Sequence, residues 1–196
     1  MSAKPKIALI ITSTRATRFA DIPAQWMLAQ AKARTDMTVE LVDLRDYDLP
    51  FFNEMASNAW MPSQDAKAVA WQKKLAEFDG YIFVVAEYNR SITGVLKNAL
   101  DQAYVEWAKK PAAAIAYGSM GGTSALQHLR AIAVELQMVP TRNAVHIGGA
   151  DFFKVHPGMG GSGNLADIEA GLLPSAKATL DDVVWWANAT MAAKAA

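Results

Sequence analysis

The first candidate for a functional site is a polar segment that could bind a phosphate ester. Residues 12–18 read Thr-Ser-Thr-Arg-Ala-Thr-Arg, and they supply several hydroxyl groups together with the guanidinium groups of Arg15 and Arg18. Backbone N–H groups at the start of a helix carry partial positive charge, and guanidinium groups donate paired bonds, so this segment predicts a phosphate site. The alternative is a polar turn with solvated arginines. The segment lacks the Gly-Lys-Ser/Thr ending of a P-loop, so a P-loop NTPase is not expected.

Two further polar segments could bind a flat heterocycle. Residues 87–94 read Glu-Tyr-Asn-Arg-Ser-Ile-Thr-Gly and offer many donors, although they also fit a strand-to-helix loop with Thr93 as the N-cap. Residues 118–122 read Gly-Ser-Met-Gly-Gly, where the glycines would let the backbone approach a planar ligand. Ser119 directly follows a glycine, which is the wrong spacing for a nucleophile elbow, and His128 has no evident acid partner. A serine hydrolase is therefore not expected.

Short apolar runs alternate with segments of helical spacing along the chain. The runs are nearly continuous, as expected for strands covered on both faces, and predict strands at Lys6–Ile11, Val39–Leu44, Gly80–Ala86, Ala112–Tyr117 and Ala144–Ile147. The first helix is expected to begin at Asp21, as an N-cap with Pro23 in the first turn. This alternation predicts an α/β fold, a flavodoxin-like three-layer sandwich with a five-stranded parallel sheet of order 2-1-3-4-5.

The predicted sheet explains why the three polar segments belong together. Ligands of such sheets bind outside the carboxyl ends of the strands, where the strand order reverses between strands 1 and 3. The three segments follow the first, third and fourth strands, so we expect them to converge there. Two irregular stretches, Arg45–Ser63 and Gly148–Leu173, are too long for simple turns and are expected to be functional loops.

Composition limits the classes of function. The chain has 196 residues, 19 basic and 19 acidic residues, no cysteine and 52% hydrophobic content. We expect a single domain over residues 1–196. Zero net charge argues against binding to nucleic acid, and the lack of cysteine excludes disulfides and thiolate chemistry. The apolar run at residues 7–11 is too short for a signal peptide or a membrane span, so a cytoplasmic protein without a membrane partner is expected.

Taken together, the three segments resemble the NADPH-dependent FMN reductase family of flavodoxin-like proteins, which includes quinone, azo and chromate reductases. The sharpest part is residues 87–101, which are similar to the family signature P-E-Y-N-x-S-x-P-G-x-L-K-N-A-x-D. Residues 13–18 resemble its G-S-x-R phosphate loop, and residues 119–122 resemble its second flavin-edge loop. The resemblance covers the first three-quarters of the chain.

The resemblance implies roles for particular residues. Ser13, Arg15 and Arg18 would bind the FMN phosphate. The flavin ring would be held, largely by backbone groups, by residues of the other two segments: Glu87, Tyr88, Asn89, Arg90, Ser91, Ser119, Gly121 and Gly122. Backbone N–H groups from residues 87–91 would stabilise negative charge on the ring. No catalytic side chain is expected, because the chemistry would take place at flavin N5.

The resemblance further implies an NAD(P)H-dependent oxidoreductase. NADPH is expected over NADH, because an arginine could meet its 2′-phosphate, and the acceptor would be a quinone, an azo compound, a metal oxyanion or free flavin. A homodimer or homotetramer is implied, and we expect the loop that carries Trp60 to cover part of the flavin face. One alternative is a flavodoxin-type electron carrier, which zero net charge disfavours. Another is a flavodoxin-like binding module without flavin.

The chain departs from the family pattern at three positions. Thr12 replaces the loop glycine, Ala86 the first proline and Thr93 the second proline. We expect the first change to reshape the phosphate turn and the other two to make the flavin loop less rigid.

Two further patterns are not expected to carry function. Residues 158–163 fit G-x-G-x-x-G, but they follow no predicted strand and are interpreted as a loop. The three histidines lack metal-ligand spacing, so no metal site is expected.

Overall fold

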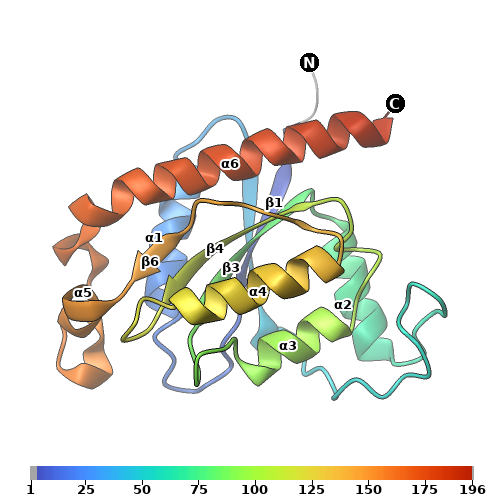
Figure 1. The fold of residues 1–196 in the computed structure, drawn as a ribbon, viewed down its shortest axis with the longest axis horizontal. Coiled ribbons are helices and arrows are strands. Elements are labelled where there is room, and N and C mark those ends of the chain that lie inside the picture. Colours follow the sequence, from blue (N-terminus) through green and yellow to red (C-terminus); the bar gives the residue numbers. More distant parts are fainter. Residues whose placement is uncertain (1–3, 196) are drawn as a thin grey trace.

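The computed structural model describes residues 4–195 and has helices on both sides of a parallel sheet (Figure 1). The strands β1 (Lys6–Ile11), β2 (Thr38–Asp43), β3 (Gly80–Ala86) and β4 (Pro111–Tyr117) lie in the order β2-β1-β3-β4. The predicted order is confirmed. β1 and β3 also have the predicted bounds, while β2 and β4 each begin one residue earlier than predicted.

The fifth position of the sheet consists of two short strands. β5 (Val139–Pro140) pairs with the beginning of β4, and β6 (Val145–Ile147) pairs with its end. The expected strand over residues 144–147 is therefore found as β6, whereas β5 was not predicted. Between the two, the Thr141 hydroxyl donates to the carbonyl of Asn143 at 2.9 Å, so the chain makes a local turn there. A two-residue strand is too short to produce a hydrophobic pattern.

The strands are apolar throughout because helices cover both faces of the sheet. Every residue of β3 and β4 is buried. One face is covered by α1 (Asp21–Lys32) and the long α6 (Glu169–Ala195), which form one hydrophobic cluster with it. The other face is covered by α2 (Ala66–Ala76), α3 (Gly94–Asp101) and α4 (Thr123–Glu135). Within residues 4–195 no helix has both the length and the apolarity to cross a bilayer.

The helix ends partly match the sequence prediction. Thr93 caps α3 as predicted, because its Oγ1 accepts a hydrogen bond from the N–H of Leu96 at 3.2 Å. Asp21 is not the N-cap of α1: it is the first helical residue, Ala20 occupies the cap position, and the Asp21 carboxylate binds Arg18 instead. The ion pair with Arg18 thus takes the carboxylate that would otherwise cap the helix.

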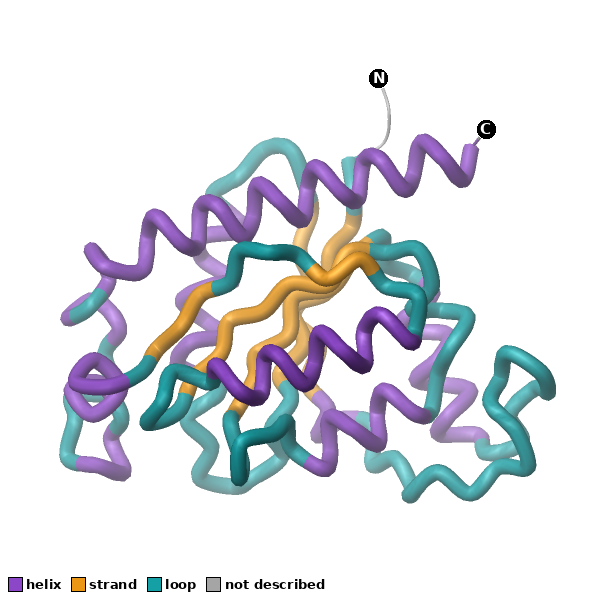
Figure 2. The backbone as a smooth tube through the Cα atoms, in the orientation of Figure 1, coloured by secondary structure: helices purple, strands orange, loops and turns teal. Residues whose placement is uncertain are grey.

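The two long irregular stretches differ from one another. After a short 3-10 turn η1 (Leu44–Asp46), the chain runs without regular structure to α2 (Figure 2). The second stretch contains α5 (Gly149–Val155) and the 3-10 turns η2 (Pro157–Met159) and η3 (Leu165–Asp167). Its glycine-rich run follows α5 rather than a strand, and the N–H of Gly161 bonds to the carbonyl of His156 at 3.0 Å. The interpretation of this run as a loop is confirmed.

Candidate functional site

The three predicted polar segments meet at one edge of the sheet. They follow the carboxyl ends of β1, β3 and β4, at the lower edge in Figure 1. Arg15 Nη1 lies 3.2 Å from the hydroxyl oxygen of Tyr88, which joins the first two segments. The carboxylate of Glu87 accepts from the backbone N–H groups of Ser124 and Ala125 at 3.0 and 3.2 Å, which joins the second segment to the start of α4. The convergence predicted from strand order is therefore present.

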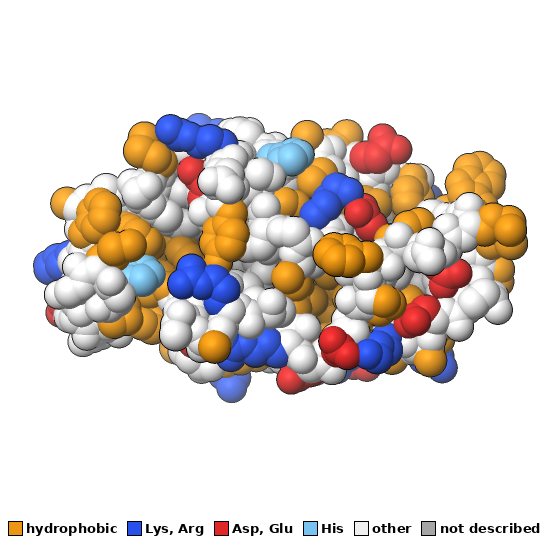
Figure 3. All heavy atoms as spheres, turned by 90° about the horizontal axis from the view of Figure 1, so that it is seen from below, with side chains coloured by type: hydrophobic (Ala, Val, Ile, Leu, Met, Phe, Trp, Pro, Cys, Tyr) orange, Lys and Arg blue, Asp and Glu red, His pale blue; other side chains and the backbone are white. Residues whose placement is uncertain are grey.

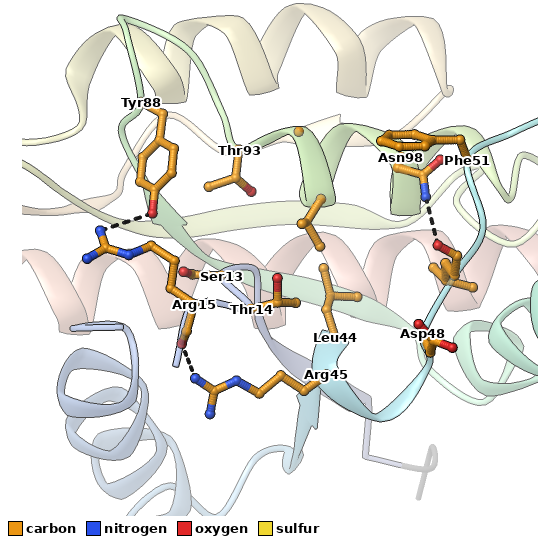
Figure 4. Close-up of a pocket in the computed structure, with 13 residues that line it drawn as sticks. Ser13, Thr14, Arg15, Leu44, Arg45, Asp48, Phe51, Tyr88, Thr93 and Asn98 are labelled. Carbon is orange, nitrogen blue, oxygen red and sulfur yellow. Dashed lines mark hydrogen bonds between the residues drawn. The ribbon is translucent and has the colours of Figure 1, made fainter. Parts of the chain in front are cut away.

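A pocket of about 520 Å³ opens between the first two segments and the end of β2 (Figure 4). This volume is within the range of small-molecule sites. Ser13, Arg15 and Tyr88 line it, as the sequence prediction requires, and Arg45 and Asp48 line it as well. The pocket thus has a polar end beside residues 13–15. Leu44, Leu49, Phe51 and Val95 add apolar side chains to its lining.

Ser13 is the most buried polar residue of this pocket. It is only 3% exposed, and its hydroxyl forms no hydrogen bond with any other residue that the structure describes. The hydroxyl oxygen itself is not fully buried, so a ligand or water in the pocket can bond to it. The backbone N–H groups of residues 14–17 likewise have no recorded acceptor in the described part of the chain. This end of the pocket therefore offers a set of free donors.

The structure does not bring Arg18 to the pocket. Its side chain is 3% exposed and pairs with Asp43 through two N–H···O contacts of 2.7 and 2.5 Å. It also donates to Asp21 at 2.9 Å and to the carbonyl of Ser13 at 2.8 Å. Burial would raise the pKa of the Asp43 carboxyl, but the hydrogen bonds from Arg18 and from the Arg45 backbone outweigh it and lower that pKa. Arg18 thus holds residues 12–18, the predicted phosphate segment, in place through the carbonyl of Ser13.

The second segment forms a tight turn. The N–H of Tyr88 bonds to the carbonyl of Ser91, and the N–H of Ser91 bonds to the carbonyl of Tyr88, both at 2.9 Å. Asn89 and Arg90 have φ values of 50° and 67°, the left-handed geometry of a two-residue hairpin turn. The N–H of Glu87 bonds to the carbonyl of Tyr117. Of the expected row of backbone donors over residues 87–91, only those of Asn89 and Arg90 have no recorded acceptor in the described residues.

Ser91 contacts a residue to which sequence reasoning gave no role. Its hydroxyl oxygen lies 2.6 Å from Nδ1 of His128 on α4. The hydrogen bond attaches the turn to α4, so the Ser91 side chain is engaged by the protein. The two residues are 37 positions apart on separate elements, and no sequence motif links them.

Two of the residues that depart from the family pattern, Thr12 and Thr93, use their hydroxyls to bond to backbone carbonyls of other segments. The hydroxyl of Thr12 donates to the carbonyl of Val84 at 2.6 Å, and the hydroxyl of Thr93 donates to the carbonyl of Thr12 at 2.8 Å. Both threonines are buried. The Thr93 hydroxyl ties residues 87–94, the predicted flavin segment, to residues 12–18, the predicted phosphate segment, which a proline could not do, and this bond offsets the rigidity that the missing proline would supply.

The glycines of the third segment serve packing. A Cβ on Gly122 would lie 2.7 Å from the Cβ of Ala116, and a Cβ on Gly148 would lie 2.4 Å from the Cα of Gly121. Gly121 and Gly122 also have φ values of 75° and 66°, which favour glycine. Ser119 is exposed, and its carbonyl accepts from the N–H of Gly149 at 3.0 Å. This segment borders the convergence without lining the pocket.

His156 lies on the α1 side of the same edge and was not singled out by sequence reasoning. Its ring stacks on Phe19 with centroids 4.8 Å apart, and its Nδ1 is buried without a hydrogen-bond partner. Burial lowers the pKa of His156 below its ordinary value of 6.5. Residues 4–195 contain no group of three His, Asp or Glu side chains placed to hold a metal ion.

Comparison with known proteins adds three findings. A family model described as NADPH-dependent FMN reductase matches residues 5–151. An NAD(P)H-dependent FMN reductase of Nectria sp is 33% identical over 190 residues, covering 91% of this chain and 94% of that protein. A 2-hydroxy-1,4-benzoquinone reductase of Burkholderia sp is 33% identical over 141 residues, covering 68% of this chain and 73% of that protein.

A solved structure has the same fold. FerB, a flavoenzyme NAD(P)H:(acceptor) oxidoreductase from Paracoccus denitrificans, superposes with a TM-score of 0.67 at 22% identity. The match covers 91% of this chain and 97% of that one. The predicted flavodoxin-like architecture is thereby confirmed.

Proposed function

The chain belongs to the NADPH-dependent FMN reductase family, and on that premise we propose that FMN binds at the convergence of residues 12–18 and 87–91. Family membership makes it an enzyme, an FMN oxidoreductase that uses NAD(P)H. The observation that carries the proposed site is the contact between Arg15 and Tyr88 at a pocket on the strand-order switch. We further propose that residues 1–196 act as one domain in the cytoplasm, which suits a chain without cysteine.

The polar end of the pocket suits the phosphate of FMN. Among the described residues, Ser13 supplies a hydroxyl without a protein partner, Arg15 supplies a guanidinium group, and residues 14–17 supply free backbone N–H groups. Such donors bind a phosphate well because they are held in place before the ligand arrives. Arg18 is a positioning residue here: it anchors the carbonyl of Ser13 and leaves the phosphate to other groups.

The turn at residues 88–91 suits the edge of the flavin ring. The free N–H groups of Asn89 and Arg90 can donate to ring oxygen or nitrogen atoms, and Tyr88 adds an aromatic face at the pocket wall. The two inward bonds between Tyr88 and Ser91 keep this turn rigid. Bound FMN would supply the redox chemistry between the nicotinamide donor and the acceptor. The chain's part is to bind and orient, so no catalytic side chain is required.

We propose NADPH as the donor and a quinone, azo compound, metal oxyanion or free flavin as the acceptor. A quinone is supported by the similarity to the Burkholderia 2-hydroxy-1,4-benzoquinone reductase. The apolar side chains of Leu44, Leu49 and Val95 in the pocket lining also suit a flat, uncharged acceptor.

We propose that a second copy of the chain covers the loop after β2, giving a homodimer or homotetramer. Phe51, Met55 and Trp60 are 86%, 90% and 85% exposed on this loop, and hydrophobic side chains stand out at its end of the molecule (Figure 3). The loop is nevertheless well held. The side-chain amide of Asn98 donates to the carbonyl of Pro50 at 2.8 Å and accepts from the N–H of Phe52 at 3.0 Å. Ordered, exposed apolar side chains indicate an interface.

The assembly proposal has a direct test. Replacing Trp60 with alanine should reduce the mass of the native particle or raise the KM for the acceptor. Light scattering after size exclusion measures the first quantity and steady-state kinetics the second. Trp185, which is exposed on α6, is the matched control residue, and Trp185→Ala should change neither. If Trp60→Ala also changed neither, the loop would have no part in assembly or in covering the site.

The proposed function is tested by the visible spectrum of the purified protein. Protein incubated with FMN and then desalted should be yellow, and anaerobic NADPH should bleach it. Colour that NADPH does not bleach would indicate a flavodoxin-type electron carrier. Protein that stays colourless would indicate a binding module without flavin. Arg15→Ala should weaken FMN binding in the same assay, while Arg142→Ala, which removes an exposed arginine elsewhere, should not.

A further inference from the structure

We propose that Arg45, at the end of β2, is the second cation of the phosphate site, in the place that the sequence motif assigns to Arg18. The ligand class is a phosphate monoester, and either the 5′-phosphate of FMN or the 2′-phosphate of NADPH would supply it. The inference rests on the proposed function and deepens it. A phosphate monoester carries nearly two negative charges at neutral pH, so two guanidinium groups match it.

Arg18 has no donor left for a ligand. A guanidinium group has five N–H bonds. In Arg18 they are all directed at protein acceptors: Nε and Nη2 reach Asp21, Nη1 reaches Asp43 and the carbonyl of Ser13, and Nη2 also reaches Asp43. To bind a phosphate, Arg18 would have to leave two carboxylates that share its charge. A partly buried pair of this kind is costly to break.

The same network places Arg45 beside the phosphate segment. Asp43 Oδ1, which binds Arg18, also accepts from the backbone N–H of Arg45 at 3.0 Å and so begins the turn η1. From that turn the Arg45 side chain reaches back and donates to the carbonyl of Arg15 (Figure 4). Arg18 therefore positions Asp43, Asp43 positions Arg45, and Arg45 lies against Arg15, the other arginine that the motif assigns to the phosphate.

The charges around the pocket leave Arg15 and Arg45 available. Among the described residues, neither guanidinium group has a carboxylate within 4.0 Å. The carboxylate that lines the pocket, Asp48, pairs with Lys67, whose hydrogen bond lowers the pKa of Asp48. Ser13, which also lines this pocket, adds a hydroxyl that bonds to no other described residue. Two guanidinium groups without a carboxylate partner among the described residues, and one free hydroxyl, thus line one cavity.

The test compares ligands that differ by one phosphate monoester. FMN is compared with riboflavin, and NADP⁺ is compared with NAD⁺. The oxidised dinucleotides are used because they cannot donate hydride during the measurement. Flavin affinities are measured by fluorescence quenching and dinucleotide affinities by calorimetry. Arg45→Ala should weaken binding of the phosphorylated member of at least one pair about tenfold, the scale of one charge-assisted hydrogen bond. The member without the phosphate should change less than about twofold. Arg45→Lys should fall between, because lysine keeps the charge and loses the paired donors.

Controls separate this inference from the proposed function. Arg142→Ala removes one positive charge far from the pocket and should bind all four ligands as the unmodified protein does. Selective loss of FMN would assign Arg45 to the flavin phosphate, and selective loss of NADP⁺ would assign it to the 2′-phosphate. Equal changes within both pairs, or equal effects of Arg45→Ala and Arg142→Ala, would overturn the inference while leaving FMN binding intact. Unmodified protein that binds neither FMN nor NADP⁺ would overturn both proposals.

Discussion

Replacing Thr93 with valine removes one hydroxyl that makes two hydrogen bonds, one within the start of α3 and one to the phosphate segment. The hydroxyl caps α3 at the N–H of Leu96 and donates to the carbonyl of Thr12, both within the core. Loss of an N-cap costs about 1 kcal/mol. Leaving the buried carbonyl of Thr12 without a partner costs about 1–3 kcal/mol more. We therefore expect the free energy of unfolding to fall by about 2–4 kcal/mol.

Urea denaturation measures this change, and two variants make it interpretable. Thr93→Ser keeps the hydroxyl and loses one methyl group, so it should cost about 1 kcal/mol or less. Thr123→Val removes an exposed hydroxyl that donates to the carbonyl of Met120, and it should change stability by no more than about 0.5 kcal/mol. FMN affinity should fall in Thr93→Val and be restored in Thr93→Ser, because the hydroxyl holds the two binding segments together. If valine and serine at position 93 gave the same stability and the same FMN affinity, the reasoning would be refuted.

Three further predictions follow from single residues. Arg18→Met leaves Asp43 without its guanidinium partner and should lower the free energy of unfolding in urea by about 2 kcal/mol or more; an unchanged midpoint would contradict the anchoring role. His156 has a pKa lowered by burial, so unfolding takes up a proton and stability should fall as pH drops through 6.5. His156→Phe, which keeps the stacking on Phe19, should lose less stability between pH 7.5 and pH 5.5 than the unmodified protein in thermal melts, and equal losses would count against this origin. Arg90→Gly relieves a φ of 67° and should raise the free energy of unfolding by about 1 kcal/mol; a decrease would show that the side chain holds the turn.

The sequence alone was enough to determine most of the sheet. Strands buried on both faces must be apolar along their whole length, so β1 and β3 were predicted with correct bounds from continuous hydrophobic runs. Alternation with helices then restricts strand order, because crossover connections between parallel strands have one hand. The edge position was harder to predict. β5 has two residues, and its pairing depends on β4 rather than on any pattern of its own.

The place of the candidate site could also be predicted from the sequence, because strand order decides which loops can meet. Residues 12–18 and 87–91 follow neighbouring strands, and Arg15 does contact Tyr88. The local cap at Thr93 was predicted for the same reason: a hydroxyl just before a helix bonds to the N–H groups of its first turn.

Only the tertiary structure decided which arginine is free to bind a ligand. Pairing of β1 with β2 sets Asp43 opposite Ile11, and this register brings a carboxylate from the neighbouring strand beside the phosphate segment. Arg18 is taken by that carboxylate and Arg45 is left beside the pocket, although both look alike in the sequence. The bond between Thr93 and Thr12 has the same origin, since it joins residues 81 positions apart. A charge or a hydroxyl is a property of the residue, whereas its partner depends on which distant segment the fold places within 3 Å of it, at hydrogen-bonding distance.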